Sequence, residues 1–187
     1  MKALRQLESA ALAIPRANVD TDQIVPARFL KRPRSENFGD VLFHDQRQLL
    51  GPAGRGEARI VVAGRNFACG SSREHAVWAL YDYGFRAAIA PSFGDIFRSN
   101  ALKNGLLPVV LAEDVVAGLL RDITAAPAAR IGIDLEAGTV TAPDGTVHRF
   151  DIEPFARQCL LEGLDELDYT LTQAARIAEF ERHYEAP

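Results

Sequence analysis

The chain has 187 residues, of which 48% are apolar and 25% charged, and its formal net charge is −4. This length fits one domain with a sizeable core, and the negative charge argues against a nucleic-acid partner, which usually meets a basic face. No apolar run approaches the length of a membrane span, and the polar start at Met1–Glu8 is not a secretory signal. We therefore expect a cytoplasmic protein with no membrane partner.

The two cysteines, Cys69 and Cys159, lie far apart in the sequence. This usage suits a reducing compartment and offers no disulfide framework. Two thiols are also fewer than the three or four thiolates that hold an iron–sulfur cluster. We expect no metal site in this chain, so cluster chemistry would have to come from another chain.

The first part of the chain reads as a turn followed by a long loop. Residues 18–26 are rich in Asx and Thr, whose side chains bond nearby backbone amides and favour turns. Residues 31–58 are polar and punctuated by Pro and Gly, and a loop of this length inside a domain is typical of a lid or binding loop. We expect it to be mobile in the isolated chain, with one part anchored by Phe38, Val41, Leu42 and Phe43.

From Arg59 onward, strands and helices alternate. The predicted strands cover residues 59–64, 87–90 and 106–111. The predicted helices run from Ser72 to Tyr83 with a stop at Gly84, from Ser92, as N-cap with Asp95 three residues later, to Asn104-Gly105, and from Asp114 to Arg121. This alternation predicts parallel strands joined by right-handed crossovers.

The C-terminal part follows a different pattern. Residues 131–135 and 139–141 alternate between apolar and polar, and Asp144-Gly145 is typical of a hairpin turn that returns through residues 147–152. A last helix is predicted from about Leu171 to Glu185. The fold class is therefore α/β, with a mixed, partly parallel sheet, flanking helices, and a C-terminal hairpin and helix.

Residues 70–75 place a hydroxyl, an arginine and a predicted helix N-terminus together. Ser71 and Glu74 have the spacing of a capping box, and Arg73 adds a fixed fork of donors beside amides that attract anions. Taken alone, the stretch is equally consistent with an ordinary capped helix. Since open α/β sheets bind ligands where strands end and helices begin, we expect the Gly70 turn, the Ser92 turn and the Asp20 loop to line one crevice.

Three kinds of chemistry could use a stretch of this type. A P-loop requires a spacing and a lysine that Gly64 and Gly70 do not provide, and the G-x-S-x-G elbow of serine hydrolases is absent around Ser71. The third is removal of a proton alpha to a carboxylate by a serine. An arginine and a helix N-terminus make its alkoxide less costly, provided that a Lewis acid expels the leaving hydroxide.

Several sequence blocks, in order along nearly the whole chain, carry the motifs of a known family. They read DTDQIVP at 20–26, FLK at 29–31, GRNFACGSSREHAVWAL at 64–80, APSFGDIF at 90–97, KNGLLP at 103–108 and LLEGLD at 160–165. Together they resemble the small subunits of 3-isopropylmalate dehydratases, the detached swivelling domain of the aconitase superfamily. The chain departs from that pattern at Arg65, where a small or acidic residue is usual, and at Ala68, where glycine is frequent.

The resemblance implies a swivelling β/β/α domain, covering residues 1–187, that completes its active site with a larger subunit in a heterodimer. That partner would carry a [4Fe-4S] cluster, while this chain supplies the base. The implied activity is a hydro-lyase reaction that isomerises 2-isopropylmalate to 3-isopropylmalate through the dehydrated alkene, in leucine biosynthesis.

The resemblance also assigns roles to single residues. Ser71 matches the catalytic base, and Ser72 and Arg73 match positions that bind the substrate carboxylate and stabilise the alkoxide. Thr21 is expected to bind substrate, and Arg28 and Leu30 belong to the segment that shapes the pocket for the substrate side chain. Asp20 and Thr21 are equally consistent with a structural turn, and a role for Arg16 stays open.

Other functions remain open on sequence alone. The nearest is the same chemistry on homoaconitate, citraconate or dimethylmalate, because the residues that select the substrate lie in the loop around Arg28 to Lys31. A different class is a non-catalytic RNA-binding module, against which the acidic balance of the chain argues.

Overall fold

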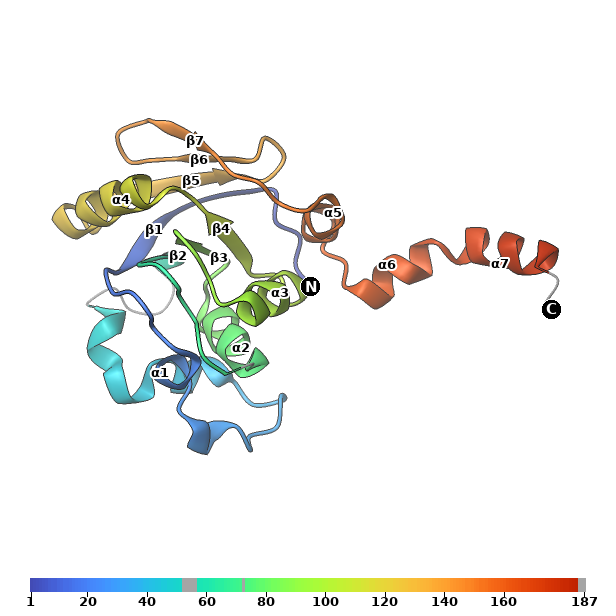
Figure 1. Ribbon diagram of the computed structural model, residues 1–187, viewed down its shortest axis with the longest axis horizontal. Helices are drawn as coiled ribbons and strands as arrows, with labels where there is room; N and C mark the ends of the chain where they lie inside the picture. Colours follow the sequence, from blue (N-terminus) through green and yellow to red (C-terminus); the bar gives the residue numbers. More distant parts are fainter. Residues whose placement is uncertain (52–56, 72, 185–187) are drawn as a thin grey trace.

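The computed structural model describes residues 1–51, 57–71 and 73–184. Its centre is a seven-stranded sheet in the order β4-β3-β2-β1-β5-β6-β7 (Figure 1). The strands are β1 (Gln6–Ile14), β2 (Ala58–Ala63), β3 (Ala87–Ala90), β4 (Leu107–Val110), β5 (Arg130–Asp134), β6 (Thr139–Thr141) and β7 (Val147–Arg149). Strands β1 to β4 pair in parallel and β5 to β7 join antiparallel. The predicted mixed α/β sheet is confirmed.

Helices cover both faces of this sheet. The α-helices are α1 (Thr21–Ile24), α2 (Glu74–Tyr83), α3 (Asp95–Lys103), α4 (Glu113–Ala125), α5 (Pro154–Glu162), α6 (Glu166–Thr172) and α7 (Ala174–His183). Short 3₁₀ helices occupy Ala27–Phe29 (η1), Phe38–Val41 (η2) and His44–Leu50 (η3). The helix predicted from about Leu171 is confirmed as α7, which begins at Ala174, whereas α5 and α6 were not predicted.

Successive side chains on the buried strands enter two separate cores. Val61 and Ala63 pack with α2, α3 and η2 on one face, whereas Ile60 and Val62 pack with α4 and β5 on the other. This alternation follows from the two-residue period of a strand. Figure 1 shows α1 and α2 on one side of the parallel strands and α4 on the other.

Strand β1 lies at the middle of the sheet, between β2 and β5, and it was not predicted. Its register against β2 shifts between Ala10 and Ala11. Beside this irregularity the Ser9 hydroxyl accepts a hydrogen bond from the Arg59 amide at 3.0 Å and donates to the Glu57 carbonyl at 3.3 Å. The buried serine hydroxyl thus satisfies two backbone groups of the neighbouring segment. A serine in the sequence does not by itself reveal this role.

The long segment after η1 is held against α2. Phe38, Leu42 and Phe43 are fully buried, which confirms the predicted anchor. The carboxylate of Asp82 accepts hydrogen bonds from the Phe38 amide at 3.0 Å and from Arg34 at 2.9 and 3.0 Å. Residues 52–56 of this segment lie outside the described chain. The mobility of residues 31–58 in the free subunit stays a prediction.

The segments that follow β1 and β2 pass each other at Gly64. A Cβ atom on this residue would lie 2.5 Å from the carbonyl oxygen of Arg16 and 2.9 Å from the backbone nitrogen of Ala17. These contacts are with backbone, so no side chain can turn away to make room.

We predict that Gly64→Ala lowers the free energy of unfolding by about 1–3 kcal/mol, as overpacking does elsewhere. Urea unfolding measures the change. The matched control is Gly118→Ala on α4, where the new Cβ meets only Arg121 Nη2 at 3.7 Å. That variant should gain about 0.5–1 kcal/mol from helix propensity. Equal stability of the two variants would contradict the close approach at Gly64.

Candidate functional site

Three loops that follow parallel strands meet at one edge of the sheet. The Asn18 amide donates to the Arg65 carbonyl at 2.9 Å, which joins the loops after β1 and β2. The Phe67 amide donates to the Ser92 carbonyl at 3.0 Å, which joins the loops after β2 and β3. The Asp20 loop, the Gly70 turn and the Ser92 turn therefore lie side by side, as the alternation of strands and helices predicts.

Thr21 holds the candidate base in place. Its amide donates to the Cys69 carbonyl at 3.0 Å, and its hydroxyl donates to the Ser71 carbonyl, also at 3.0 Å. Thr21 is buried, with 1% of its surface exposed, whereas Ser71 is exposed. The buried Thr21 thus fixes the backbone of Ser71, while Ser71 itself stays exposed on the surface.

The turn predicted at residues 18–26 contains a true capping box. An Asp20 carboxylate oxygen accepts from the Gln23 amide at 2.7 Å, and the Gln23 side chain accepts from the Asp20 amide at 3.0 Å. Asp20 thereby caps α1, whose first residue is Thr21. This explains why the short helix forms although it has only four residues.

The capping box predicted for Ser71 and Glu74 is wrong. Helix α2 begins at Glu74, and its N-cap is Arg73, with no side-chain cap. Instead of turning back to the N-cap, the Glu74 carboxylate accepts from the Asn104 side chain at 2.7 Å. Asn104, 30 residues away in the sequence, therefore binds the Glu74 carboxylate that a local capping box would use.

The cap predicted for Ser92 is also wrong, because α3 begins at Asp95 with Gly94 as its N-cap and no side-chain cap. The Ser92 hydroxyl accepts from the Asn66 amide at 2.8 Å. Ser92 therefore fastens its loop to the loop after β2 and does not start a helix.

Arg73 forms an ion pair with Asp22, the residue that follows Thr21. The Arg73 side chain is 16% exposed, and that of Asp22 is 54% exposed. The guanidinium is thus partly enclosed at the same edge as Ser71. A substrate carboxylate can therefore bind the Arg73 guanidinium either through N–H donors that Asp22 does not use or by displacing Asp22.

Of the two residues predicted to shape the pocket, Leu30 lies beside the first turn of α2 and Arg28 does not. Leu30 is half-buried and packs against the core cluster that contains α2, and its backbone polar group raises the pKa of the nearby His75 ring. Burial lowers the pKa of His75, and the carboxylate of Glu74 opposes this only in part. Arg28 is held elsewhere, against Asp45 and His44 on η3, and its guanidinium lowers the pKa of Asp45. The structure therefore brings Leu30, but not the Arg28 head group, against α2.

The loop that carries Ser71 needs unusual backbone conformations. Gly70 has φ +88°, which glycine adopts without strain. Ala68 has φ +56° although it carries a side chain, which costs roughly 1–2 kcal/mol. This left-handed conformation gives a physical reason why glycine suits the position of Ala68.

The cysteines do not form a cluster site. Cys69 lies on the loop after β2, whereas Cys159 is buried on α5, where burial raises the pKa of its thiol. Among the described residues no group of three or more His, Cys, Asp and Glu side chains could hold a metal ion. No helix in the same part of the chain is long and apolar enough to cross a bilayer. Ser72, the remaining predicted site residue, lies outside the described residues.

Sequence reasoning missed the residues that support the site. Asp22, which pairs with Arg73, and His75, which lies near the backbone of Leu30, were not given these roles. Asn104 was also missed; its side chain accepts from the Trp78 indole at 3.1 Å and donates to Glu74. The available signal was that all three lie inside the blocks that carry the family motifs.

Comparisons with known proteins agree with the fold and the motifs. The model of the aconitase C-terminal domain matches residues 53–114, and the LeuD_N model matches residues 117–154. A 3-isopropylmalate dehydratase small subunit of Anaeromyxobacter sp. (strain K) is 52% identical over 191 residues, covering 97% of this chain and 98% of the relative. The small subunit 2 of the enzyme of that name in Bordetella pertussis is 46% identical over 200 residues, covering 97% and 93%.

A solved structure with lower sequence identity shows the same fold. The 3-isopropylmalate dehydratase (leuD) of Methanocaldococcus jannaschii superposes with a TM-score of 0.72 at 24% identity, covering 93% of this chain and 98% of the other. The predicted aconitase-type fold and the predicted family are both confirmed. With such identity to its curated relatives over nearly its whole length, the chain belongs to the family of 3-isopropylmalate dehydratase small subunits.

Proposed function

We propose that this chain is the small subunit of a hydro-lyase that isomerises 2-isopropylmalate to 3-isopropylmalate by dehydration and rehydration, in leucine biosynthesis. The observation that carries the proposal is the 52% identity, over 97% of the chain, to a relative named for this activity. The exposed Ser71 beside Arg73, at the sheet edge where α/β proteins bind ligands, supports it.

In this proposal Ser71 is the catalytic base, which removes the proton alpha to a substrate carboxylate. A serine hydroxyl ionises too weakly for this task unless positive charge stabilises its alkoxide. Arg73 lies two residues away, and its guanidinium is fixed at the same edge by Asp22. Thr21 is best understood as a positioning residue, because its hydroxyl is directed to the Ser71 carbonyl.

Arg73 and Ser72 would bind the substrate carboxylate, for which the planar guanidinium offers two parallel donors. Leu30 and its neighbours would contact the substrate side chain, and the apolar surface of Leu30 suits an isopropyl group. Arg28 belongs to the same segment and would limit the pocket on the side of η3, where Asp45 holds it.

The reaction also needs a Lewis acid that expels hydroxide. The described residues of this chain do not provide the ligands that an iron–sulfur cluster would need for this task. Cys69 and Cys159 lie on separate elements, and two thiols cannot hold a [4Fe-4S] cluster. We therefore place the cluster on a larger partner subunit, together with the other half of the site. Such a metabolic complex would work in the cytoplasm, in keeping with the reducing environment that free cysteines favour.

The proposal predicts that this chain, mixed with its cognate cluster-bearing large subunit, turns over isopropylmalate faster than related acids. The alkene intermediate can be followed spectroscopically with isopropylmalate, homoaconitate, citraconate and dimethylmalate as alternative substrates. Turnover of isopropylmalate no faster than that of the other acids would refute the substrate assignment.

Replacing the candidate base should separate catalysis from assembly. Ser71→Ala should reduce kcat by about 100- to 10,000-fold, the usual contribution of a general base, while binding to the large subunit is unchanged. The control is Thr124→Ala, which removes an exposed hydroxyl on α4 that donates to the Leu120 carbonyl of its own helix. Near-normal turnover by the Ser71 variant would exclude this residue as the base.

The hydrogen bond from Thr21 to Ser71 gives a prediction that rests on geometry alone. Thr21→Val keeps the shape of the side chain but removes the donor, which should cost about 1 kcal/mol of stability. It should also lower kcat by roughly 10- to 100-fold, because the base is misplaced. Thr21→Ser keeps the hydroxyl and should restore most of the rate. Equal kcat values for the Val and Ser variants would show that this hydrogen bond does not position Ser71.

A further inference from the structure

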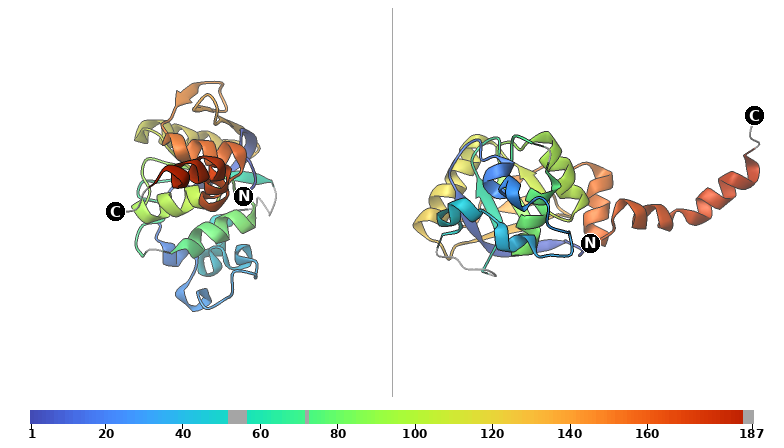
Figure 2. Two further views of the ribbon diagram at one scale, coloured as in Figure 1. Left: turned by 90° about the vertical axis from the view of Figure 1, so that its right-hand side faces the viewer. Right: turned by 90° about the horizontal axis from the view of Figure 1, so that it is seen from below.

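The side chain of Asn104, at the end of α3, joins that helix to two turns of α2. Figure 1 and Figure 2 show α2 and α3 side by side, and both contribute to the same core. The Asn104 amide nitrogen donates to the Glu74 carboxylate at 2.7 Å and to the Asn100 carbonyl at 2.9 Å. Its amide oxygen accepts from the Trp78 indole at 3.1 Å. Both N–H donors and the oxygen of this one side chain are therefore engaged.

These contacts require an amide at residue 104, and in one orientation. The Glu74 carboxylate can only accept a hydrogen bond, whereas the Trp78 indole can only donate one. Turning the Asn104 amide over would set its oxygen against the carboxylate and its N–H groups against the indole N–H. An aspartate here would have no donor for Glu74, and a leucine would serve neither group.

The two contacts on α2 fix how this helix lies. Glu74 is its first residue, and Trp78 lies one turn further on the same face. A side chain that binds both residues resists sliding of the helix along its axis and rotation about it. No described side chain caps the start of α2, so the place of its first turn depends on contacts with neighbouring elements.

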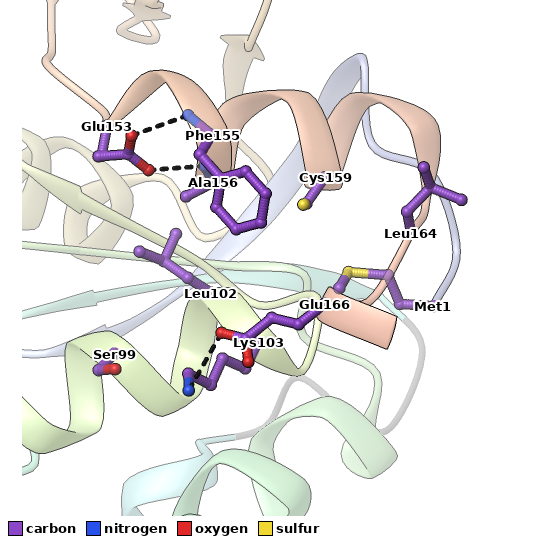
Figure 3. Close-up of a pocket in the computed structure, with 10 residues that line it drawn as sticks. All are labelled: Met1, Ser99, Leu102, Lys103, Glu153, Phe155, Ala156, Cys159, Leu164 and Glu166. Carbon is purple, nitrogen blue, oxygen red and sulfur yellow. Dashed lines mark hydrogen bonds and ion pairs between the residues drawn. The ribbon is translucent and has the colours of Figure 1, made fainter. Parts of the chain in front are cut away.

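The end of α3 that carries Asn104 is itself attached to the body of the protein. Leu102 packs against the core on the other face of the sheet. With Phe155 of α5 it lines a cavity of about 160 Å³, and Lys103 pairs with Glu166 beside it at 3.1 Å (Figure 3). Asn104 therefore holds α2 from a fixed point.

The first turn of α2 carries the arginine proposed to bind the substrate carboxylate. Arg73 directly precedes Glu74, and its guanidinium pairs with Asp22 of α1. Asp22 thus holds the head group of Arg73, whereas Glu74 holds the backbone from which that side chain extends. Loss of the bond between Asn104 and Glu74 would release the first turn and displace the guanidinium.

We propose that Asn104 is a positioning residue for Arg73, which keeps the guanidinium where the substrate carboxylate binds. Asn104 acts through Glu74 and Trp78 and does not touch substrate. This rests on the proposed function, which gives Arg73 a carboxylate to bind.

Exchanging the donor and the acceptor of the Asn104–Glu74 pair tests the proposal in the complex with saturating large subunit. Asn104→Asp removes the donor and sets two carboxylates against each other, so the KM for isopropylmalate should rise about tenfold. Adding Glu74→Gln restores an amide–carboxylate pair with exchanged roles, and KM should return to within about threefold of wild type. The matched control is Gln158→Glu on α5, where the Gln158 amide donates to Glu162 at 3.2 Å on the exposed surface. The same chemical change there should leave KM unaltered.

The isolated chain offers a readout that needs no turnover, because Trp78 is its only tryptophan. The single indole N–H resonance in a ¹H–¹⁵N spectrum reports the bond to Asn104. Asn104→Leu removes the acceptor and should move this resonance together with the backbone amide resonances of Arg73 and Glu74. Gln158→Glu should move none of the three.

Three results would overturn the positioning role. They are a wild-type KM in Asn104→Asp, a raised KM that Glu74→Gln does not reverse, and an unchanged Arg73 amide resonance in Asn104→Leu. A purely structural role would give the first of these, because loss of folded protein lowers turnover without raising KM. A wild-type complex that does not turn over isopropylmalate would refute the proposed function, and the resonances of Trp78 and Arg73 would then decide the role of Asn104 alone.

Discussion

Because β1 and β2 run parallel, the chain leaves both strands at the same edge of the sheet, and the candidate site depends on this. The two following segments pass so closely that Gly64 has no room for a Cβ beside the Arg16 carbonyl. Beyond that contact, Thr21 bonds both Cys69 and Ser71. Ser71 and Arg73 are therefore positioned by the neighbouring loop, through Thr21 and Asp22, because helix α2 begins with no side-chain cap.

The strands of the sheet could be predicted where burial produces a simple pattern of apolar residues in the sequence. Strands β2 and β3 are buried on both faces and appear as continuous apolar runs, such as Ile60 to Ala63, so periodicity finds them. Strand β1 is equally central but contains Glu8 and Ser9. Its serine serves backbone groups near a shift in register, and that role depends on tertiary structure. Local pattern therefore missed the strand that joins the two halves of the sheet.

The site was predictable in its residues but not in its contacts. Asp20 forms the capping box that its own neighbourhood offers, whereas Glu74 and Ser92 bond partners about 30 residues away and leave their predicted caps unmade. A capping motif records only what the local chain can do. In this fold the loops lie so close together that a neighbouring loop supplies the better partner. The motif blocks named Ser71, Arg73 and Thr21, but they did not reveal that Thr21 bonds the Ser71 backbone or that Asp22 pairs with Arg73.

The exposure of Ser71 follows from the same arrangement of loops, because the Thr21 hydroxyl donates to the backbone carbonyl of Ser71 while the residue itself stays exposed. A residue that is exposed at this edge can reach a molecule that binds across the loops, whereas the buried Thr21 cannot. The loops therefore divide two tasks between a buried residue, Thr21, that fixes the backbone and an exposed residue, Ser71, that is free to contact a ligand.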